Sequence, residues 1–196
     1  MRHAYIYIII LAVSLMVGCS TPQYKAMSQS FRLGVPIRQT TNQVQYVELS
    51  AERVETFISS QGVDTKLRNT SDKYFCAVSE EWFTTTVLPE YWQFLKDLEL
   101  QNRYEDEKND CDDYTRAFTF FCKMKARRTM DMRYNMAVAD VFYYVGGNKK
   151  NPHAINGIIV MTKEGNLKLI YVEPQTAGKF PEPSVDISKN VYFWSM

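Results

Sequence analysis

The spacing of apolar residues predicts two helices in the middle of the chain. Over residues 86–102, apolar side chains recur every three to four positions, and Pro89 suits the first turn of such a helix. A second helix is predicted to begin after Asn109 or Asp110, since either residue is a good N-cap, and to run to about Lys125. We expect the apolar faces of these helices to pack on each other.

Apolar runs in the C-terminal half predict strands. Residues 136–145 form a nearly continuous apolar run, which is typical of a buried strand. Residues 154–161 and 167–172 are predicted to be two strands of a hairpin joined by a turn at 162–166, and residues 192–194 a final strand. Helices followed by antiparallel strands indicate an α+β fold in which the second helix packs on a small antiparallel sheet.

Length and composition favour one core. The chain has 196 residues, of which 45% are apolar, which is enough for a single sizeable domain. We expect this α+β domain to span residues 45–196, behind a tether at 20–44 that is rich in Pro, Ser, Thr and Gln. The 23 basic and 22 acidic residues are interspersed, so the sequence predicts no nucleic-acid partner.

Residues 1–19 have the pattern of a targeting segment. A short basic start precedes an apolar run over 5–17, which is shorter than the ~20 residues that a membrane span requires. The run ends in Met16-Val17-Gly18-Cys19, which resembles a bacterial lipobox, so Cys19 is the predicted site of lipidation by acyl chains such as palmitate. With Ser20 next, the resemblance implies a lipid anchor in the outer membrane, facing the periplasm. An uncleaved signal anchor and plain secretion are the alternatives.

One pairing is favoured among the three remaining cysteines. Cys111 and Cys122 are eleven residues apart, or ~16 Å along a continuous helix, so they cannot form a disulfide with each other. A Cys76–Cys122 disulfide would leave Cys111 free in an oxidising compartment. The alternative is that all three are buried free thiols.

Cys111 is the candidate nucleophile. It lies in the first turn of its predicted helix, where free N–H groups and the helix dipole favour a thiolate. If the hairpin turn centres on residues 164–165, Asn156 lies opposite Glu173, and His153 and Glu173 come to the same end of two strands. That register places His153 and Glu173 on opposite faces, so a catalytic triad requires a bulge or loop near Pro174. The alternative is a core cysteine and a surface histidine.

Three short motifs carry a family resemblance. Residues 110–114 (DCDDY), 153–156 (HAIN) and 172–176 (VEPQT) resemble, in order and spacing, the papain-like cysteine peptidase domain at the C-terminus of a mushroom agglutinin and its bacterial and phage relatives. The resemblance covers roughly residues 85–180. It implies a papain-like or transglutaminase-like fold, with Cys111 as nucleophile, His153 as base and Glu173 orienting the histidine.

The resemblance also implies a reaction and a metal. Cys111 would attack a carbonyl of a peptide or protein substrate, and water or an amine would resolve the thioester, giving hydrolysis or transamidation. Asn156, Gln175 and Asn109 are secondary site candidates, and Asn109 is one option for the oxyanion side chain. The resemblance further implies dependence on calcium, with Asp112 and Asp113 as candidate ligands.

Two functions therefore compete at this point. One is a membrane-anchored cysteine peptidase or amidase of the cell envelope. The other is a catalytically inactive lipoprotein that serves as a binding or interaction module at the outer membrane. A structure separates them through the contacts that Cys111 and His153 make.

Overall fold

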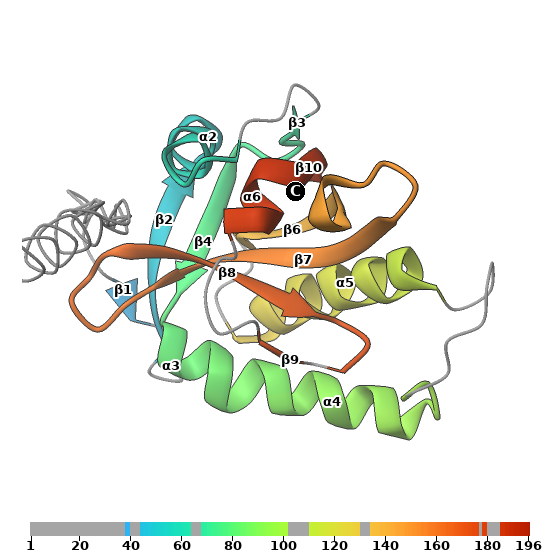
Figure 1. Cartoon of the computed structure of the whole chain (residues 1–196). Helices are drawn as coiled ribbons and strands as arrows, with labels where there is room; N and C mark the ends of the chain where they lie inside the picture. The colour runs from blue at the N-terminus through green and yellow to red at the C-terminus, as the bar shows by residue number, and fades with distance from the viewer. Residues whose placement is uncertain are drawn as a thin grey trace, which may run out of the picture. The chain divides into compact units, whose positions relative to one another are not determined.

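A computed structural model describes residues 38–39, 44–63, 68–101, 110–129, 134–176, 178–179 and 185–196 (Figure 1). The predicted signal and Cys19 lie outside these residues, as does Asn109. The predicted tether is corrected at its end, because Arg38–Gln39 forms a strand that pairs with the first strand of the domain. No helix among the described residues is long and apolar enough to cross a membrane.

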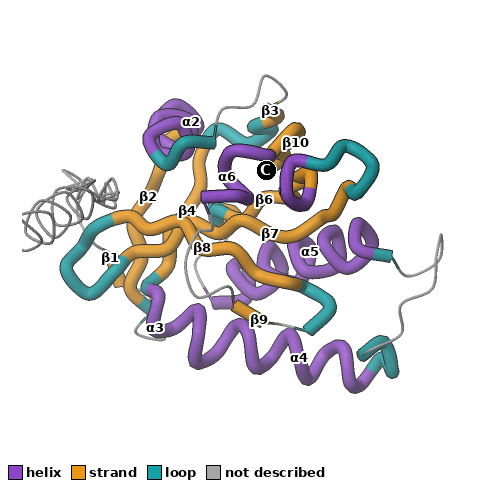
Figure 2. Tube along the Cα trace, in the orientation of Figure 1, coloured by secondary structure: helices purple, strands orange, loops and turns teal. Residues whose placement is uncertain are grey.

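The strands form two sheets, which Figure 2 shows in orange. The smaller sheet has the order β1-β2-β4-β5, and its strands are Arg38–Gln39, Gln45–Ser50, Tyr74–Val78 and Asn135–Met136. The larger sheet has the order β3-β10-β6-β7-β8-β9, with strands Arg68–Asn69, Val191–Ser195, Val138–Tyr144, Pro152–Met161, Leu167–Glu173 and Gly178–Lys179. The three central strands β6, β7 and β8 are antiparallel neighbours, which confirms the predicted hairpin.

Helices cover both faces of the sheets. In chain order they are α2 (Ala51–Ser60), α3 (Glu80–Trp82), a π-helical segment (Phe83–Val87), α4 (Leu88–Asp97), α5 (Cys111–Thr129), a 3₁₀ turn (Val145–Gly147) and α6 (Val185–Asn190). The first predicted helix begins and ends earlier than expected, because Ser79 caps it through the backbone N–H of Trp82. The second is confirmed and runs four residues further than predicted.

The core consists of two clusters on opposite faces of the larger sheet. Alternate residues of β7 enter each cluster: Ile155 and Ile159 lie on the face of α2 and α6, while Ile158 and Val160 lie on the face of α4 and α5. Because both faces of β7 are buried, this strand reads as a continuous apolar run rather than an alternating one. The α+β class with the Cys111 helix on antiparallel strands is therefore confirmed, whereas a papain-like topology is not.

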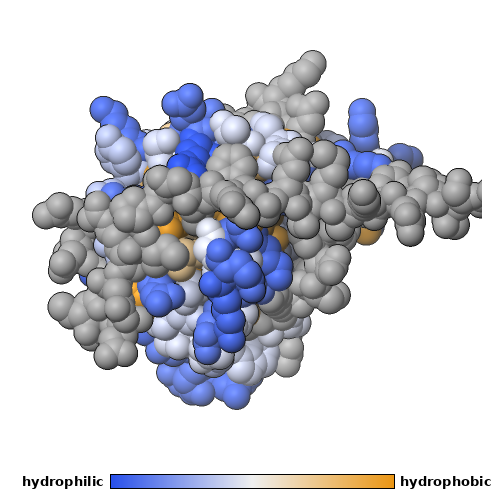
Figure 3. All heavy atoms as spheres, turned by 90° about the vertical axis from the view of Figure 1, so that its left-hand side faces the viewer, coloured by the Kyte–Doolittle hydropathy of each residue, from blue (hydrophilic) through white to orange (hydrophobic). Residues whose placement is uncertain are grey.

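Gly157 allows β7 and β10 to pack closely. A Cβ atom on this residue would lie 2.6 Å from Cη2 of the buried Trp194 ring and 3.0 Å from Val141 Cγ2. The rigid indole therefore occupies the space that any side chain would need. On the face shown in Figure 3, which is the side of β1, the described residues are mostly hydrophilic with small hydrophobic areas.

Candidate functional site

The N-terminus of α5 is built around Asp110, which confirms one of the two predicted caps. Asp110 Oδ1 accepts hydrogen bonds from the backbone N–H groups of Asp112 and Asp113, at 3.2 and 3.4 Å. Thr115 Oγ1 donates a hydrogen bond to the carbonyl oxygen of Cys111 at 2.7 Å, which links the Thr115 side chain to the backbone of the first helical turn. Cys111 is thus half-buried at a fixed helix terminus, as the sequence predicts.

The register of the β7–β8 hairpin differs from the predicted one by one residue. Asn156 pairs with Val172 rather than with Glu173. This pairing extends to place Glu173 opposite residue 155, two positions from His153, so both side chains project from the same face. The bulge that the sequence reasoning required is therefore not needed.

His153 and Glu173 form an ion pair beside Cys111. The distance from His153 Nε2 to Glu173 Oε2 is 2.8 Å, and the side chains are 26% and 21% exposed. Glu173 is held at its other oxygen, because Oε1 accepts from the backbone N–H of Gln175 at 3.3 Å. The structure therefore brings the three predicted residues together, and Gln175 contributes its backbone to the arrangement.

The imidazole is held in its charged form. A hydrogen bond with Cys111 and another with Glu173 raise the pKa of His153 to about 9, although burial of the ring acts in the opposite direction. The ring of Tyr143 lies edge-on to the imidazole, with 5.8 Å between the ring centroids. At neutral pH the site therefore carries an imidazolium between a carboxylate and a sulfur atom.

Protonation of His153 is expected to couple folding to pH. Its pKa rises from an ordinary 6.5 to about 9 in the folded chain, so its stabilising contribution is complete below pH 6.5 and is lost as the pH rises through 9. Urea unfolding should show that the free energy of unfolding of wild type falls by roughly 1–2 kcal/mol between pH 6 and 9.5, and that His153→Gln lacks this fall. The expected value is smaller than ~1.4 kcal/mol for each unit of pKa shift, because the side chains are partly exposed to solvent. Parallel pH profiles of the two proteins would contradict the charged imidazole.

Asn156 fastens the helix that carries Cys111 to the strand that carries His153. This side chain is completely buried, and its Nδ2 lies 3.1 Å from the Thr115 carbonyl oxygen and 3.0 Å from Thr119 Oγ1. It also lies 3.2 Å from the Ala139 carbonyl oxygen and 3.4 Å from Asp140 Oδ1. Asn156 therefore belongs to the support of the site rather than to its exposed surface.

Asp140 is part of the same buried network. Thr119 donates to its Oδ1, and burial raises the pKa of this carboxyl, although the bond from Thr119 and the charge of Lys123 act in the opposite direction. The network contains a threonine, an asparagine and an aspartate within otherwise apolar packing. Asn156 Oδ1 has no hydrogen-bond partner among the described residues, whereas the other polar groups of the network are paired. Paired polar groups inside apolar packing fix the position of one element against another.

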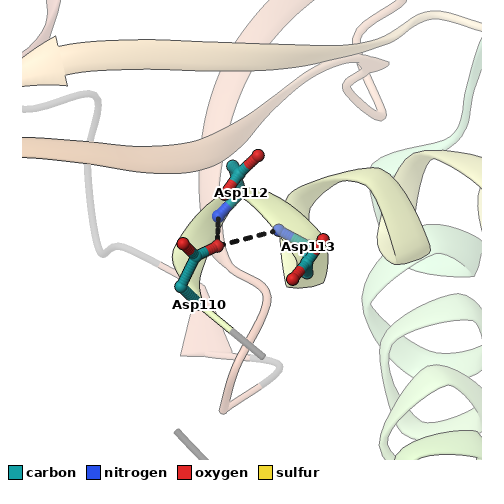
Figure 4. A group of neighbouring side chains, drawn as sticks. All are labelled: Asp110, Asp112 and Asp113. Carbon is teal, nitrogen blue, oxygen red and sulfur yellow. Dashed lines mark hydrogen bonds between the residues drawn. The ribbon is translucent and has the colours of Figure 1, made fainter. Parts of the chain in front are cut away.

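The predicted calcium ligands lie in an acidic cluster, shown in Figure 4. Ligand atoms of Asp110, Asp112 and Asp113 lie within 4.8 Å of one another. Asp110 is occupied as the cap, and Arg116 pairs with Asp112 at 2.8 Å and with Asp113 at 3.8 Å. A hydrogen bond between Asp110 and Asp112 lowers the pKa of the first and raises that of the second. Calcium takes ~6–8 oxygen ligands, and these three carboxylates already have partners within the protein, so calcium binding by Asp112 and Asp113 stays a prediction from the sequence.

The predicted disulfide is not formed. Cys76, Cys111 and Cys122 are all free thiols, and both Cys76 and Cys122 are completely buried in the cluster between the sheet and α5. Burial raises the pKa of both buried thiols far above the ordinary value. The pairing was predicted because it would leave Cys111 as the one free thiol in an oxidising compartment. Apolar packing alone accounts for Cys76 and Cys122, which are the buried free thiols of the alternative that the sequence also allowed.

Aromatic residues next to the site were missed from the sequence. Tyr144 and Tyr192 stack on each other with 4.3 Å between ring centroids, and both are half-buried. Tyr144 is the last residue of β6, and the residue before it, Tyr143, pairs with His153. The sequence places Tyr144 near the end of a predicted strand, shortly before Gly146 and Gly147. It does not indicate that the ring of Tyr192 stacks on that of Tyr144.

Comparison with known proteins gives fold similarity only. No family model matches the chain, and no curated protein matches it. A solved structure titled PSL1a–E64 complex is similar at a TM-score of 0.56 and 16% identity, covering 76% of this chain and 50% of that one. A second structure, Polyporus squamosus lectin bound to the human-type influenza-binding epitope Neu5Acα2-6Galβ1-4GlcNAc, has a TM-score of 0.54 and 15% identity, covering 76% and 49%. The chain spans about half the length of either structure.

These comparisons correct the family and the function predicted from the motifs. The second of these structures is titled as a lectin, neither title names a peptidase, and no family model matches the chain. The assignment to papain-like cysteine peptidases, with hydrolysis or transamidation of peptides, is therefore withdrawn. The comparisons also give no evidence for a signal peptide or a lipoprotein, and the outer-membrane location stays a prediction from the sequence. A fold does not determine an activity, so the function must be argued from the site.

Proposed function

We propose that this chain is a ligand-binding module and that its ligand is a carbohydrate held at Cys111, His153 and Glu173. The observation that supports the proposal is the fixed, partly exposed carboxylate of Glu173, which is bound at one oxygen by His153 and at the other by the backbone of Gln175. A carboxylate offers about four lone-pair positions. Two are used within the protein, so the others are available to hydroxyl groups of a ligand.

The charged pair gives the site the rigidity that binding of a hydroxyl-rich molecule requires. Recognition of small polar ligands depends on a few polar groups whose positions are set before the ligand arrives. Here the helix cap, the β7–β8 pairing and Asn156 set those positions. The ligand class follows the lectin of the same fold, whose structure contains a glycan epitope. An inactive binding module was also the alternative function that the sequence allowed.

A glycan array tests this proposal. Fluorescently labelled wild-type chain should retain a defined subset of glycans, and His153→Gln and Glu173→Gln should each weaken that retention at least about tenfold, since each removes one member of a charge-assisted pair. Glu164→Gln, in the exposed hairpin turn of residues 162–166, is the matched control and should bind as wild type does. Absence of binding by wild type, or equal binding by all four proteins, would overturn the proposal.

A further inference from the structure

We infer that the exposed side of α5 docks onto a lipid bilayer with anionic headgroups. The surface concerned, called the α5 docking surface below, consists of two apolar side chains and the three arginines around them: Phe120, Met124, Arg116, Arg127 and Arg128. The inference goes beyond the proposed function, since it concerns another part of the molecule. It is also argued without the lipid anchor that the sequence predicts.

Two apolar side chains on α5 are exposed to solvent. Phe120 is 64% exposed and Met124 is 41% exposed, whereas most large apolar residues of the described chain are buried. The two are four residues apart on one helix, so they are neighbours on the same side of it. The opposite side of α5, with Phe118 and Cys122, is completely buried in the cluster between the helix and the sheet. The exposed pair therefore faces away from the core.

Arginines lie at both ends of this apolar pair. Arg116 is four residues before Phe120, while Arg127 and Arg128 are three and four residues after Met124. These spacings make each arginine a neighbour of an apolar side chain on the helix surface. All three arginines are exposed. The apolar pair is therefore the centre of a surface whose edges are positively charged.

The charge of this part of α5 is one-sided. Residues 114–129 contain five basic side chains and no acidic one, whereas the whole chain has 23 basic and 22 acidic residues. Lys123 and Lys125 form ion pairs with acids of neighbouring elements. Within the described part of the chain, Arg127 and Arg128 have no carboxylate partner. These two arginines therefore supply most of the positive charge that an anionic partner would meet.

An anionic bilayer matches both parts of this surface at once. Its headgroups attract cations, and the hydrocarbon beneath them accepts apolar side chains. Arginine suits this boundary, because its aliphatic stem lies along apolar surface while the guanidinium stays at the level of the headgroups. A nucleic-acid duplex offers phosphates without hydrocarbon, and an apolar groove on a protein offers no dense negative charge. The combination of side chains therefore favours a bilayer.

The α5 docking surface is distinct from the candidate site. Cys111 is the first residue of α5, and Phe120 lies nine residues later, which is about 14 Å along the helix axis. The candidate site contains residues of the first turn and of strands β7 and β8, whereas the apolar pair belongs to the C-terminal half of the helix. The two surfaces therefore do not compete for the same residues.

Tryptophan quenching in the full chain tests this docking. Phe120→Trp is mixed with vesicles of phosphatidylcholine and phosphatidylglycerol that carry a nitroxide group on the lipid acyl chain. The fluorescence should be quenched at least about twofold more than that of Leu98→Trp, because residue 120 enters the boundary of the hydrocarbon. Leu98 is the matched control, since it is 51% exposed but lies between Asp97 and Glu99.

The background is the same in both proteins. The three native tryptophans and the apolar run over residues 5–17 are present in each variant, so any attachment of the chain through that run does not change the comparison. Urea unfolding of each variant confirms that the fold is kept. Excess quenching of Phe120→Trp over Leu98→Trp therefore reports the position of α5 alone.

A second pair of variants tests the role of charge. Adding Arg127→Gln and Arg128→Gln to Phe120→Trp should lower its quenching to that of Leu98→Trp, since the headgroups no longer attract the helix. Adding Lys149→Gln and Lys150→Gln instead is the matched control, which removes two exposed cations from the loop between β6 and β7 and should keep the full quenching. Vesicles of phosphatidylcholine alone should give no excess quenching.

The outcomes that would overturn the inference are specific. Equal quenching of Phe120→Trp and Leu98→Trp on anionic vesicles would show that α5 does not meet the bilayer, and a protein partner would then be the occupant to seek. Excess quenching that is the same on neutral vesicles, or that survives the loss of both arginines, would contradict recognition of anionic headgroups. None of these results bears on the glycan array, which tests other residues.

Discussion

Iodoacetamide is expected to modify Cys111 in the native protein at least about a hundredfold faster than Cys76 or Cys122. Cys111 is half-buried at a helix N-terminus beside the charged imidazole of His153, so the reagent can reach its sulfur atom. Cys76 and Cys122 are completely buried and react only when the chain opens. Mass spectrometry of peptides from the alkylated native protein at pH 7 measures the three rates separately.

Two variants assign the origin of that reactivity. Cys111→Ser should remove the fast-labelling peptide and leave the slow ones unchanged. His153→Gln should slow labelling of Cys111 roughly tenfold, since it removes the cation next to the sulfur atom. Lys150→Gln, which removes an exposed cation from the loop before His153, is the matched control and should leave the rate unchanged. Slow labelling of Cys111, at the rate of the buried cysteines, would show that this residue is structural.

Replacement of Asn156 by alanine is expected to lower the free energy of unfolding by about 2–4 kcal/mol. An amide nitrogen has two hydrogens, and here they are shared among four acceptors on α5 and β6. The variant leaves buried acceptors without a donor and adds a small cavity, and each effect costs about 1–3 kcal/mol. Urea unfolding measures the change.

The matched control for Asn156 is Asn151→Ala. Asn151 is exposed in the loop between β6 and β7, so its side chain can be removed at a cost of no more than about 0.5 kcal/mol. If Asn156→Ala is as mild as Asn151→Ala, the buried network does not fasten α5 to the sheet. We also expect Asn156→Ala to weaken the contact between Cys111 and His153, because Asn156 holds their two elements together. That weakening would be absent too if the network does not have this role.

The sequence predicts elements better than it predicts their relative register. Strands β6, β7, β8 and β10 and helix α5 follow directly from apolar runs and a capping residue. The hairpin register depends on one turn: a two-residue turn at 164–165 pairs Asn156 with Glu173, whereas the observed loop, closed by the bond from the Thr162 N–H to the Asn166 carbonyl, pairs Asn156 with Val172. That single residue moves His153 and Glu173 onto the same face.

The early start of the first helical run has a similar local cause. The buried residues Phe83, Val87, Tyr91 and Leu95 are spaced four apart, which is wider than the 3.6 residues of an α-helix turn. The π-helical segment over Phe83–Val87 accommodates that spacing. A search for the α-helical period therefore detects the regular part and misses the beginning.

The candidate site divides in the same way. Cys111, His153 and Glu173 were predicted because their side chains are chemically reactive types and because the sequence indicates where each lies in a helix or a strand. Tyr192 was not, since a bulge in β10 places it and nothing in the local sequence indicates a bulge. The disulfide was predicted wrongly because cysteine number says nothing about how two buried thiols pack.

Direct titration of His153 by NMR tests the central feature of the site, a charged imidazole fixed between Cys111 and Glu173. The ring resonances are assigned with His153→Gln and followed from pH 5 to 10.5. The structure predicts a midpoint of about 9. A midpoint near the ordinary 6.5 would mean that the imidazole is not held by the thiol and the carboxylate, and the proposed binding site would lose its basis.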